Sequence, residues 1–293
     1  MPESRAVGQD VMAAVAGARR KREGGRIGPM AGKTRLDVLL AERGLAESRS
    51  LAQRLILAGQ VRVNGSHIVR PGQMVDPKVE ILVVAGPPFV SRGGDKLAAA
   101  LESFPIRVPG KTCADIGAST GGFTDCLLQH GAARVYAIDV GRGILHWKVR
   151  NDPRVVCLEG VNARYLESLP ERIDLVTIDA SFISLATLLP AACRWMTERG
   201  ELLALVKPQF EAGPAAVGRG GVVRDPATHR RVLAEVLAAM GRNALAPRGL
   251  IRSPLLGPKG NVEFLVWGDR GPPEKSTEEL LEQLGGLAAS AVT

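Results

Sequence analysis

Residues 115–123 combine three glycines with an acid, in the order Asp-Ile-Gly-Ala-Ser-Thr-Gly-Gly-Phe, between a predicted strand and a predicted helix. Glycines let the backbone turn sharply and let a ligand come close to it. At the carboxyl end of a parallel strand, such a turn is where α/β folds bind nucleotides. The order is neither the dinucleotide fingerprint nor a phosphate-binding loop, and Asp115 would repel a phosphate. The motif favours a nucleoside ligand that carries a positive charge, and glycines that serve packing alone are the alternative.

A second acid strengthens the prediction of a nucleoside site. Asp139 ends the next predicted strand, at about the 20-residue spacing where a carboxylate accepts hydrogen bonds from ribose hydroxyls. S-adenosylmethionine fits both acids, because it joins an adenosine to an ammonium and a sulfonium. We expect Glu159 and Asn162, which follow the third strand, to lie beside the adenine. The full set of expected cofactor-binding residues is Asp115, Gly117, Ser119, Gly121, Gly122, Phe123, Asp139, Glu159, Asn162 and Asp179.

Two lysines and two acids, Lys96, Asp179, Lys207 and Glu263, stand at the ends of predicted elements in the same part of the chain. The carboxyl ends of parallel strands share one crevice, so Asp179 and Lys207 should face the same hollow as the glycine-rich turn. The alternative is four separate surface charges, which is the commoner fate of any single lysine or glutamate.

The elements that must position these residues follow from alternating patterns. From residue 111 onward, apolar strands alternate with helices, which predicts an α/β fold with a doubly wound, Rossmann-like parallel sheet. We expect strands at residues 111–114, 135–139, 155–159, 173–179 and 202–207, a late strand at 262–267 and a helix at 228–240. The predicted domain runs from 96 to 269, after a linker at 86–95 and before a C-terminal tail at 270–293 that contains a short helix candidate.

The positive charge is concentrated near the N-terminus. The chain of 293 residues carries a net charge of +8. Residues 1–92 hold 15 Lys and Arg against 8 Asp and Glu, whereas the remaining 201 residues hold 23 against 22. This asymmetry predicts a module that binds a polyanion, with a solubilising tail as the alternative.

Residues 33–85 have the pattern of that module, an α+β unit with two short helices, a hairpin and a further strand at 79–84. Ser48 is a candidate N-cap for the second helix, and Asn64-Gly65 is a strong hairpin signal. The arginines of this module can hold phosphates of RNA. The expected RNA-binding residues are five of them and one arginine of the linker: Arg35, Arg43, Arg49, Arg54, Arg62 and Arg92. The segments 34–37, 48–50 and 58–65 resemble the S4-type RNA-binding domain. Residues 1–32 are expected to be a disordered basic tail, in which Met30 is a candidate start of translation.

The four cysteines have no C-x-x-C spacing, so we expect neither a metal site nor a redox pair, and a reduced, cytoplasmic location is the default. The sequence has no apolar run of about 18 residues and no signal-peptide pattern, which predicts no transmembrane helix.

Five segments in the right order give a more specific resemblance: residues 115–123, 137–141, 179–185, 206–211 and 257–264. Together with the run 89–96 and the S4-type module, they resemble the TlyA family over about residues 33 to 268. These proteins, often called haemolysins, are ribosomal RNA 2′-O-methyltransferases with an FtsJ-like catalytic domain. The resemblance implies S-adenosylmethionine as cofactor, ribosomal RNA or ribosomal subunits as partner, and cytidine as the modified nucleotide.

The resemblance also implies a catalytic Lys-Asp-Lys-Glu tetrad, which falls on Lys96, Asp179, Lys207 and Glu263. A ribose 2′-hydroxyl is a poor nucleophile, and we expect Lys207 to accept its proton. Methyl transfer would be accelerated largely by holding donor and hydroxyl in line. Where the family more often has an apolar residue before the first lysine, this chain has Asp95.

Three alternatives stay open at this point. A membrane-active cytolysin would need an amphipathic or long apolar segment, which the sequence lacks. A dinucleotide-dependent oxidoreductase is weakened by the missing glycine fingerprint. A non-catalytic RNA-binding protein is disfavoured by the presence of all four tetrad residues.

Overall fold

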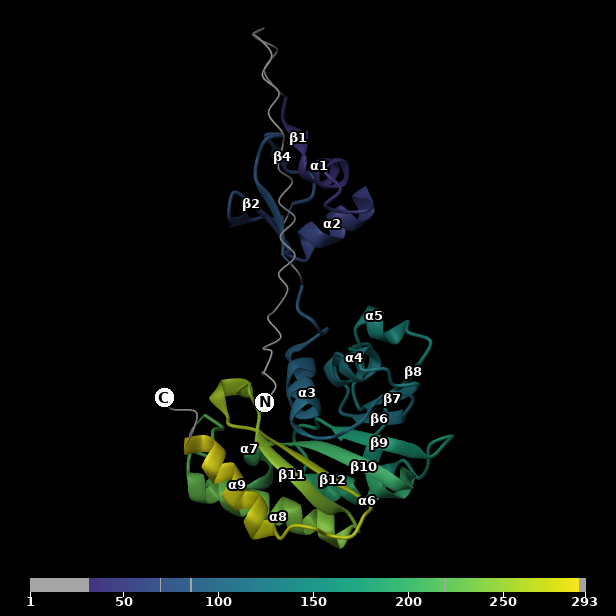
Figure 1. The fold of residues 1–293 in the computed structure, drawn as a ribbon, viewed down its shortest axis with the longest axis vertical. Helices are drawn as coiled ribbons and strands as arrows, with labels where there is room; N and C mark the ends of the chain where they lie inside the picture. The colour runs from purple at the N-terminus through teal and green to yellow at the C-terminus, as the bar shows by residue number, and fades with distance from the viewer. Residues whose placement is uncertain (1–31, 69, 85, 219, 290–293) are drawn as a thin grey trace, which may run out of the picture. The chain divides into compact units, whose positions relative to one another are not determined.

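The computed structural model describes residues 32–289 except residues 69, 85 and 219. The expected N-terminal tail, apart from Gly32, and the candidate start Met30 lie outside the described residues. The chain divides into two compact units, Met1–Gly86 and Pro87–Thr293 (Figure 1).

The first unit is the small α+β module that the arginine-rich segment predicted. Its elements are β1 (Thr34–Arg35), α1 (Leu36–Glu42), α2 (Arg49–Leu57), β2 (Val61–Val63), β3 (Ser66–His67), β4 (Met74–Val75) and β5 (Ile81–Val83). The strands form two small antiparallel sheets, in the orders β1-β4 and β3-β2-β5. Ser48 caps α2, because its hydroxyl accepts a hydrogen bond from the Leu51 N–H at 3.2 Å. The Asn-Gly pair turns the β2–β3 hairpin with positive φ at both residues, 48° and 79°.

The second unit is a three-layer α/β domain. Its strands are β6 (Thr112–Ile116), β7 (Arg134–Asp139), β8 (Val155–Glu159), β9 (Ile173–Ile178), β10 (Met196–Val206), β11 (Ala246–Arg252) and β12 (Phe264–Asp269). Its helices are α3 (Arg92–Ser103), α4 (Gly122–Gln129), α5 (Trp147–Arg150), α6 (Leu185–Trp195), α7 (Pro208–Glu211), α8 (Pro226–Arg242) and α9 (Thr277–Ala289), with 3₁₀ turns η1 (Ala163–Tyr165), η2 (Pro214–Ala216) and η3 (Pro258–Gly260).

The seven strands form one sheet in the order β11-β12-β10-β9-β6-β7-β8. The five strands β8, β7, β6, β9 and β10 are parallel, whereas β12 runs antiparallel to β10 and to β11. The strand order reverses around β6, so the carboxyl ends of β6, β7, β9 and β10 lie around one crevice. The predicted doubly wound sheet is confirmed, with an antiparallel strand added at one side.

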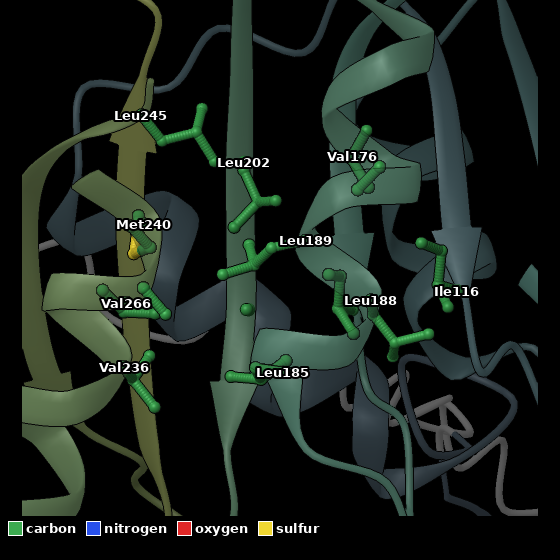
Figure 2. Packing of buried hydrophobic residues seen from close by; sticks show 14 of the residues in the cluster. Ile116, Val176, Leu185, Leu188, Leu189, Leu202, Val236, Met240, Leu245 and Val266 are labelled. Carbon is green, nitrogen blue, oxygen red and sulfur yellow. The ribbon is translucent and has the colours of Figure 1, made fainter. Parts of the chain in front are cut away.

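Successive side chains of each strand point to opposite faces, and each face is covered by helices. On one face, Ile116, Val176 and Leu202 pack against α6, α8 and α9 (Figure 2). On the other, Cys113, Val135 and their neighbours pack against α3 and α4. Burial on both faces explains why the strands read as continuous apolar runs in the sequence.

Three features of the second unit differ from the sequence expectations. Helix α3 begins at Arg92, inside the linker expected at 86–95, because this segment packs as part of the second unit, which begins at Pro87. Strand β11 was missed, because its Pro247 and Gly249 are residues that normally weaken a strand. They are tolerated at this edge, where the pairing with β12 shifts register between Pro247 and Gly249. The helix expected near Thr277 to Leu284 continues to Ala289.

Candidate active site

Two adjoining hollows open at the carboxyl ends of the central strands. The first has a volume of about 300 Å³ and holds Lys96 and Lys207, together with Arg92 and the 256–258 loop. The second has a volume of about 430 Å³ and holds Asp139 and Asn162 between apolar walls. Four residues line both hollows: Gly117, Ser119, Asp179 and Ser181. The arrangement can therefore place two ligands in contact at Asp179, one in a cationic hollow and one in a largely apolar hollow with an acid.

The tetrad expected from the sequence is divided into two ion pairs, one buried and one partly buried. In the first pair, Lys96 on α3 contacts Glu263, which directly precedes β12, at 2.5 Å between Nζ and Oε2. Glu263 is buried, and its Oε1 has no hydrogen-bond partner among the described residues. This oxygen lies directly beneath Gly257, where an added Cβ would come within 2.0 Å of it.

In the second pair, Lys207 contacts Asp179 at 2.6 Å between Nζ and Oδ1. The Lys207 ammonium also donates to the Ser181 hydroxyl at 3.0 Å and, more weakly, to the Asp179 carbonyl at 3.4 Å. Because Lys207 directly follows β10 and Asp179 directly follows the neighbouring strand β9, the parallel pairing of these strands brings them together. The amine is thus held at the edge of the cationic hollow by groups from one adjacent loop.

The glycine-rich turn approaches this pair closely. Gly117 has φ of +82°, and a Cβ there would lie 2.7 Å from the Asp179 carbonyl oxygen. Position 117 therefore requires glycine for two reasons: its backbone is left-handed, and it lies too close to the Asp179 carbonyl for a side chain. The turn continues through Ser119, whose φ of 49° is uncommon for a residue with a side chain.

Asp139 holds the turn and still faces the second hollow. Its Oδ2 accepts a hydrogen bond from the Ser119 N–H at 2.8 Å, and its Oδ1 accepts one from the Gly141 N–H at 2.7 Å. Each carboxylate oxygen has two acceptor sites, so two sites are left for the hydroxyls of a ribose. The geometry fits the expected role of Asp139.

We expect Asp139→Asn to weaken binding of S-adenosylmethionine or its demethylated product by about 10- to 100-fold, the range for losing hydrogen bonds to a charged acceptor. Isothermal titration calorimetry measures this directly. Asp174→Asn is the matched control, because Asp174 accepts the Thr112 N–H at the opposite end of the sheet. Equal affinities for wild type and Asp139→Asn would refute the assignment.

Asp115 lies deeper than expected. It is fully buried, lines neither hollow, and accepts hydrogen bonds from Thr124 Oγ1 at 2.7 Å and Thr177 Oγ1 at 3.1 Å. The pKa of Asp115 is raised from 3.8 to about 7, mainly because the carboxyl group is buried. The hydrogen bonds from the two threonines lower this pKa, and the nearby charge of Asp179 raises it further. Its contact with the ammonium of the cofactor stays a prediction.

This pKa gives a testable pH dependence of stability. Between about pH 4 and 7 the folded chain keeps the Asp115 proton that the unfolded chain has lost, so the free energy of unfolding falls as pH rises through this window. Relative to Asp115→Asn, the wild type should lose on the order of 2–3 kcal/mol between pH 5 and pH 8. Urea unfolding at both pH values measures the difference. Parallel pH dependences would contradict a buried, protonated Asp115.

Glu159 and Asn162 have separate roles in the structure. Asn162 lines the second hollow and caps η1. Glu159 does not line it, because its carboxylate accepts the backbone N–H groups of Gly143, Ile144 and Leu145 at 2.9 to 3.2 Å. It also pairs with Arg150 at 2.6 Å, and these contacts lower the pKa of Glu159 to about 2. Glu159 thus fixes the loop that carries Ile144 into the wall of the hollow, and its direct contact with the cofactor stays a prediction.

The other residues of the turn join α4 to α3. Gly121 has φ of +94°, and Gly122 touches the start of α3, where an added Cβ would lie 2.2 Å from Ser91 Oγ. Phe123 is buried and lines the first hollow. Gly122 also lines the first hollow, whereas Gly121 packs against Leu145 and Val149.

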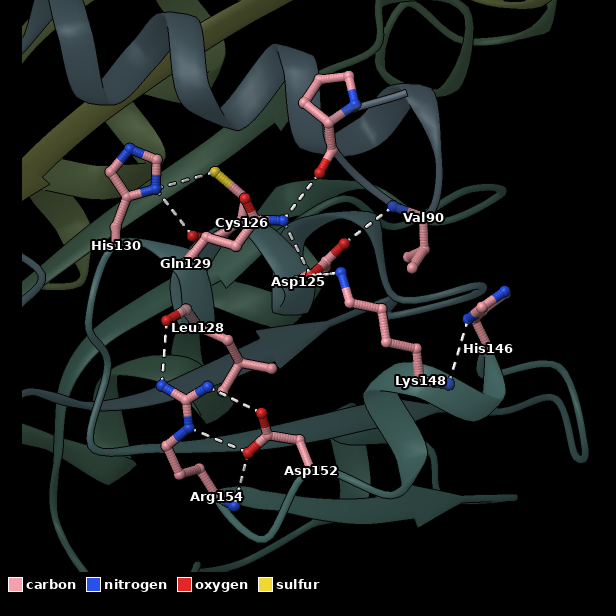
Figure 3. Close-up of polar contacts among 11 residues, drawn as sticks. Val90, Asp125, Cys126, Leu128, Gln129, His130, His146, Lys148, Asp152 and Arg154 are labelled. Atoms are coloured by element: carbon pink, nitrogen blue, oxygen red, sulfur yellow. Dashed lines mark hydrogen bonds and ion pairs between the residues drawn. The ribbon is translucent and has the colours of Figure 1, made fainter. Parts of the chain in front are cut away.

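Helix α4 also fastens the segment that leads into α3. Asp125 accepts the Val90 N–H at 2.9 Å, and Gln129 donates to the Pro88 carbonyl at 2.8 Å (Figure 3). Lys148 contacts the same Asp125 carboxylate at 3.2 Å. These contacts hold the first turn of α3, and with it Arg92 and Lys96, over the glycine-rich turn.

The expected RNA-binding arginines fall into different environments. Arg35 and Arg49 both contact the buried carboxylate of Asp37. Arg43 donates hydrogen bonds to the carbonyls of Pro77 and Val79. The remaining two of the first unit differ again: Arg54 is exposed on α2, whereas Arg62 on β2 has a buried Nε without a partner among the described residues. In the second unit, Arg92 lines the first hollow and donates to the Leu256 carbonyl at 3.2 Å.

Several site residues were not predicted individually. Ser181 and Phe182 lie between Asp179 and α6, in a segment quoted only as part of the resemblance. Phe182 is 89% exposed with φ of +64°, and its ring lies 4.8 Å from that of Phe210. An exposed aromatic ring on left-handed backbone is costly and typical of a functional site. Val140, Ile144 and the 256–258 loop also line the hollows, and no spacing rule identifies them.

The fold and the two hollows define the class of protein. The model of FtsJ-like methyltransferases matches residues 89–270, and the model of the S4 domain matches residues 34–81. The chain is an S-adenosylmethionine-dependent methyltransferase with an S4 domain.

Comparison with individual proteins narrows the class. The chain is 47% identical over 262 residues to the 16S/23S rRNA (cytidine-2′-O)-methyltransferase TlyA of Mycobacterium tuberculosis, covering 87% of this chain and 98% of that protein. It is 42% identical to Hemolysin A of Brachyspira hyodysenteriae, covering 79% and 98%. A solved structure, named as a hemolysin from Streptococcus thermophilus, has a TM-score of 0.66 at 39% identity and covers 89% and 99%. The chain belongs to the TlyA family.

The same comparisons resolve the cytolysin alternative. Proteins named as haemolysins and as rRNA methyltransferases match this chain over nearly their whole lengths, so the haemolysin name is a mislabel within one enzyme family. Among the described residues, no helix combines the length and the apolar character needed to cross a bilayer. In the same residues, no group of three or more His, Cys, Asp or Glu side chains could hold a metal ion.

Proposed function

We propose that this chain methylates the 2′-hydroxyl of cytidines in ribosomal RNA, with the two hollows holding donor and acceptor. The observation that supports this most is the juxtaposition of the two hollows at Asp179, with both tetrad lysines in the first. S-adenosylmethionine supplies an electrophilic methyl group when it is bound. The second hollow fits it, because Asp139 offers free acceptor sites and the surrounding walls are largely apolar.

The residues of the first hollow act on the acceptor. In its neutral amine form, Lys207 accepts the proton of the 2′-hydroxyl and becomes an ammonium, which Asp179 and Ser181 then hold. Lys96, held by Glu263, presents a second cation that favours the developing negative charge on the oxygen. Arg92 lies on the rim of the hollow and can hold a phosphate beside the acceptor ribose.

The S4 domain supplies affinity for RNA that the small catalytic hollow lacks. Because ribosomal RNA is the proposed substrate of both the S4 domain and the catalytic domain, we propose that the enzyme works in the cytoplasm, with ribosomes. The M. tuberculosis relative carries both 16S and 23S RNA in its name. We propose the same substrate class here, cytidines of 16S and 23S RNA.

The test is transfer of labelled methyl from S-adenosylmethionine to unmodified 16S and 23S RNA, offered as free RNA and as subunits. Alkaline hydrolysis of the product follows, because a 2′-O-methyl group blocks cleavage at its own linkage. We expect label in an alkali-resistant dinucleotide whose 5′ member is cytidine. Label released in mononucleotides would overturn ribose methylation, and resistant label at another base would overturn the choice of cytidine.

A further inference from the structure

A single buried acid organises two arginines on the surface of the first unit. Asp37 lies in the first turn of α1 and is 0% exposed, although it is an aspartate in a module rich in arginine. Its carboxylate accepts four hydrogen bonds. Arg35 donates through Nε and Nη2, both at 3.0 Å, Arg49 donates through Nε at 3.0 Å, and Gln53 donates at 2.7 Å. These three segments, β1, α1 and α2, therefore meet at one anion.

The contacts leave the outer edges of both guanidinium groups without partners. The side chains of Arg35 and Arg49 are 43% and 54% exposed. Among the described residues, Arg35 donates only through Nε and Nη2 and Arg49 only through Nε, so Arg35 Nη1 and both Nη atoms of Arg49 have no hydrogen-bond partner. The Arg35 guanidinium also lies against Gly72, where an added Cβ would be 3.1 to 3.3 Å from three of its atoms. Each arginine is thus fixed on one side and open on the other.

The charges at this site do not balance locally. Two guanidinium groups share one carboxylate, which leaves one net positive charge and two ordered donor edges. The pKa of Asp37 is held well below its usual range, mainly by its hydrogen bond with Arg35, so the anion persists at every physiological pH. Planar guanidinium edges match phosphate oxygens, and ordering them before binding reduces the entropy lost on binding.

We propose that Asp37 is a positioning residue for RNA binding: it holds Arg35 and Arg49 as a preformed clamp for phosphates of the RNA backbone. This inference rests on the proposed function, because it assumes that the S4 domain binds the RNA substrate. It goes further by distinguishing the two clamp arginines from Arg43, whose donors are committed to backbone carbonyls.

Removal of the Asp37 charge should change the affinity for RNA in the direction opposite to the usual one. Removing an acid from an RNA-binding surface normally strengthens binding, because the protein becomes more positive. Asp37→Asn should instead raise the Kd for unmodified 23S RNA at least about tenfold, since two arginine side chains lose their fixed orientation. Glu47→Gln is the matched control, because exposed Glu47 has no partner among the described residues and its removal should lower the Kd or leave it unchanged.

Arg49→Lys keeps the charge and leaves Asp37 paired with Arg35 and Gln53, so it tests the clamp without exposing the buried acid. A lysine lacks the Nε donor and the planar edge. It should therefore weaken RNA binding as much as Arg49→Ala does, and Asp37→Asn should add little in an Arg35→Ala/Arg49→Ala background. All variants are compared as full-length chains at one salt concentration, with methylation measured at saturating RNA, where kcat should not change.

Several outcomes would overturn the clamp. These are tighter RNA binding by Asp37→Asn, wild-type binding by Arg49→Lys, or additive effects in the triple variant. If Asp37→Asn melts the first unit, as seen by circular dichroism, Arg49→Lys alone decides. Failure of the wild type to bind or methylate ribosomal RNA would instead refute the proposed function, and the inference with it.

Discussion

Lys207→Ala should slow methyl transfer by about 10²- to 10⁴-fold while leaving the affinity for S-adenosylmethionine unchanged. The rate falls because the variant has no amine to accept the proton of the ribose hydroxyl. The affinity is retained because Lys207 lines only the first hollow, not the one that contains Asp139. Single-turnover transfer of labelled methyl to ribosomal RNA gives the rate, and calorimetry gives the affinity.

A second substitution at this position distinguishes two roles of Lys207, that of a proton acceptor and that of a fixed positive charge. Lys207→Arg keeps a cation beside Asp179, but an arginine does not lose its proton in proteins. If Lys207 accepts the proton, the arginine variant should be about as slow as the alanine variant. Substantial activity in Lys207→Arg would mean that the position supplies only positive charge. Lys275→Ala, an exposed lysine after β12, is the control for removing a lysine elsewhere.

Gly257→Ala should reduce the transfer rate by about 100-fold although residue 257 carries no reacting group. The added Cβ would lie 2.0 Å from Glu263 Oε1 and 2.5 Å from its Cδ, so the carboxylate must turn away. This movement breaks the 2.5 Å contact with Lys96 and displaces that amine from the first hollow. The clash falls on the far end of one side chain, so the fold should survive with a loss of about 1–3 kcal/mol in unfolding free energy.

The cause of this loss can be tested in a second background. In Glu263→Ala the added methyl group has room, so Gly257→Ala should cost nothing further in rate. Gly241→Ala in α8 is the control glycine, because a Cβ there meets nothing within 4 Å and should be neutral or slightly stabilising. An equal loss of rate from Gly257→Ala with and without Glu263 would show that the loop, not the ion pair, is responsible.

The two ion pairs also explain why four charged residues can share one buried site. Each lysine has its own carboxylate, so neither ammonium is left unpaired in the protein interior. The two ion pairs share no residue, so loss of one pair should leave the other in place. Comparison of Gly257→Ala with Lys207→Ala therefore measures the two halves of the tetrad independently.

By itself the sequence determined the class of fold and the composition of the site. Alternating strands and helices predict a parallel sheet because each buried strand must be apolar on both faces, and the glycine-rich turn followed by Asp139 predicts a nucleoside site from local spacing alone. The arginine excess before residue 93 likewise predicts an RNA-binding module without reference to its structure. These are properties of neighbouring residues, which local patterns report.

Only the tertiary structure decided which of these residues meet. Lys96 and Glu263 are 167 residues apart in the sequence, and their contact depends on the order of the strands and on a glycine in a third segment. Asp115 is enclosed by threonines from α4 and β9, whereas Glu159 turns to a backbone loop instead of the hollow. Arg35 and Arg43 look alike in the sequence, but one is held by a buried acid and the other by carbonyls. Pairing between distant segments sets the partners of each charge, and no local pattern contains that information.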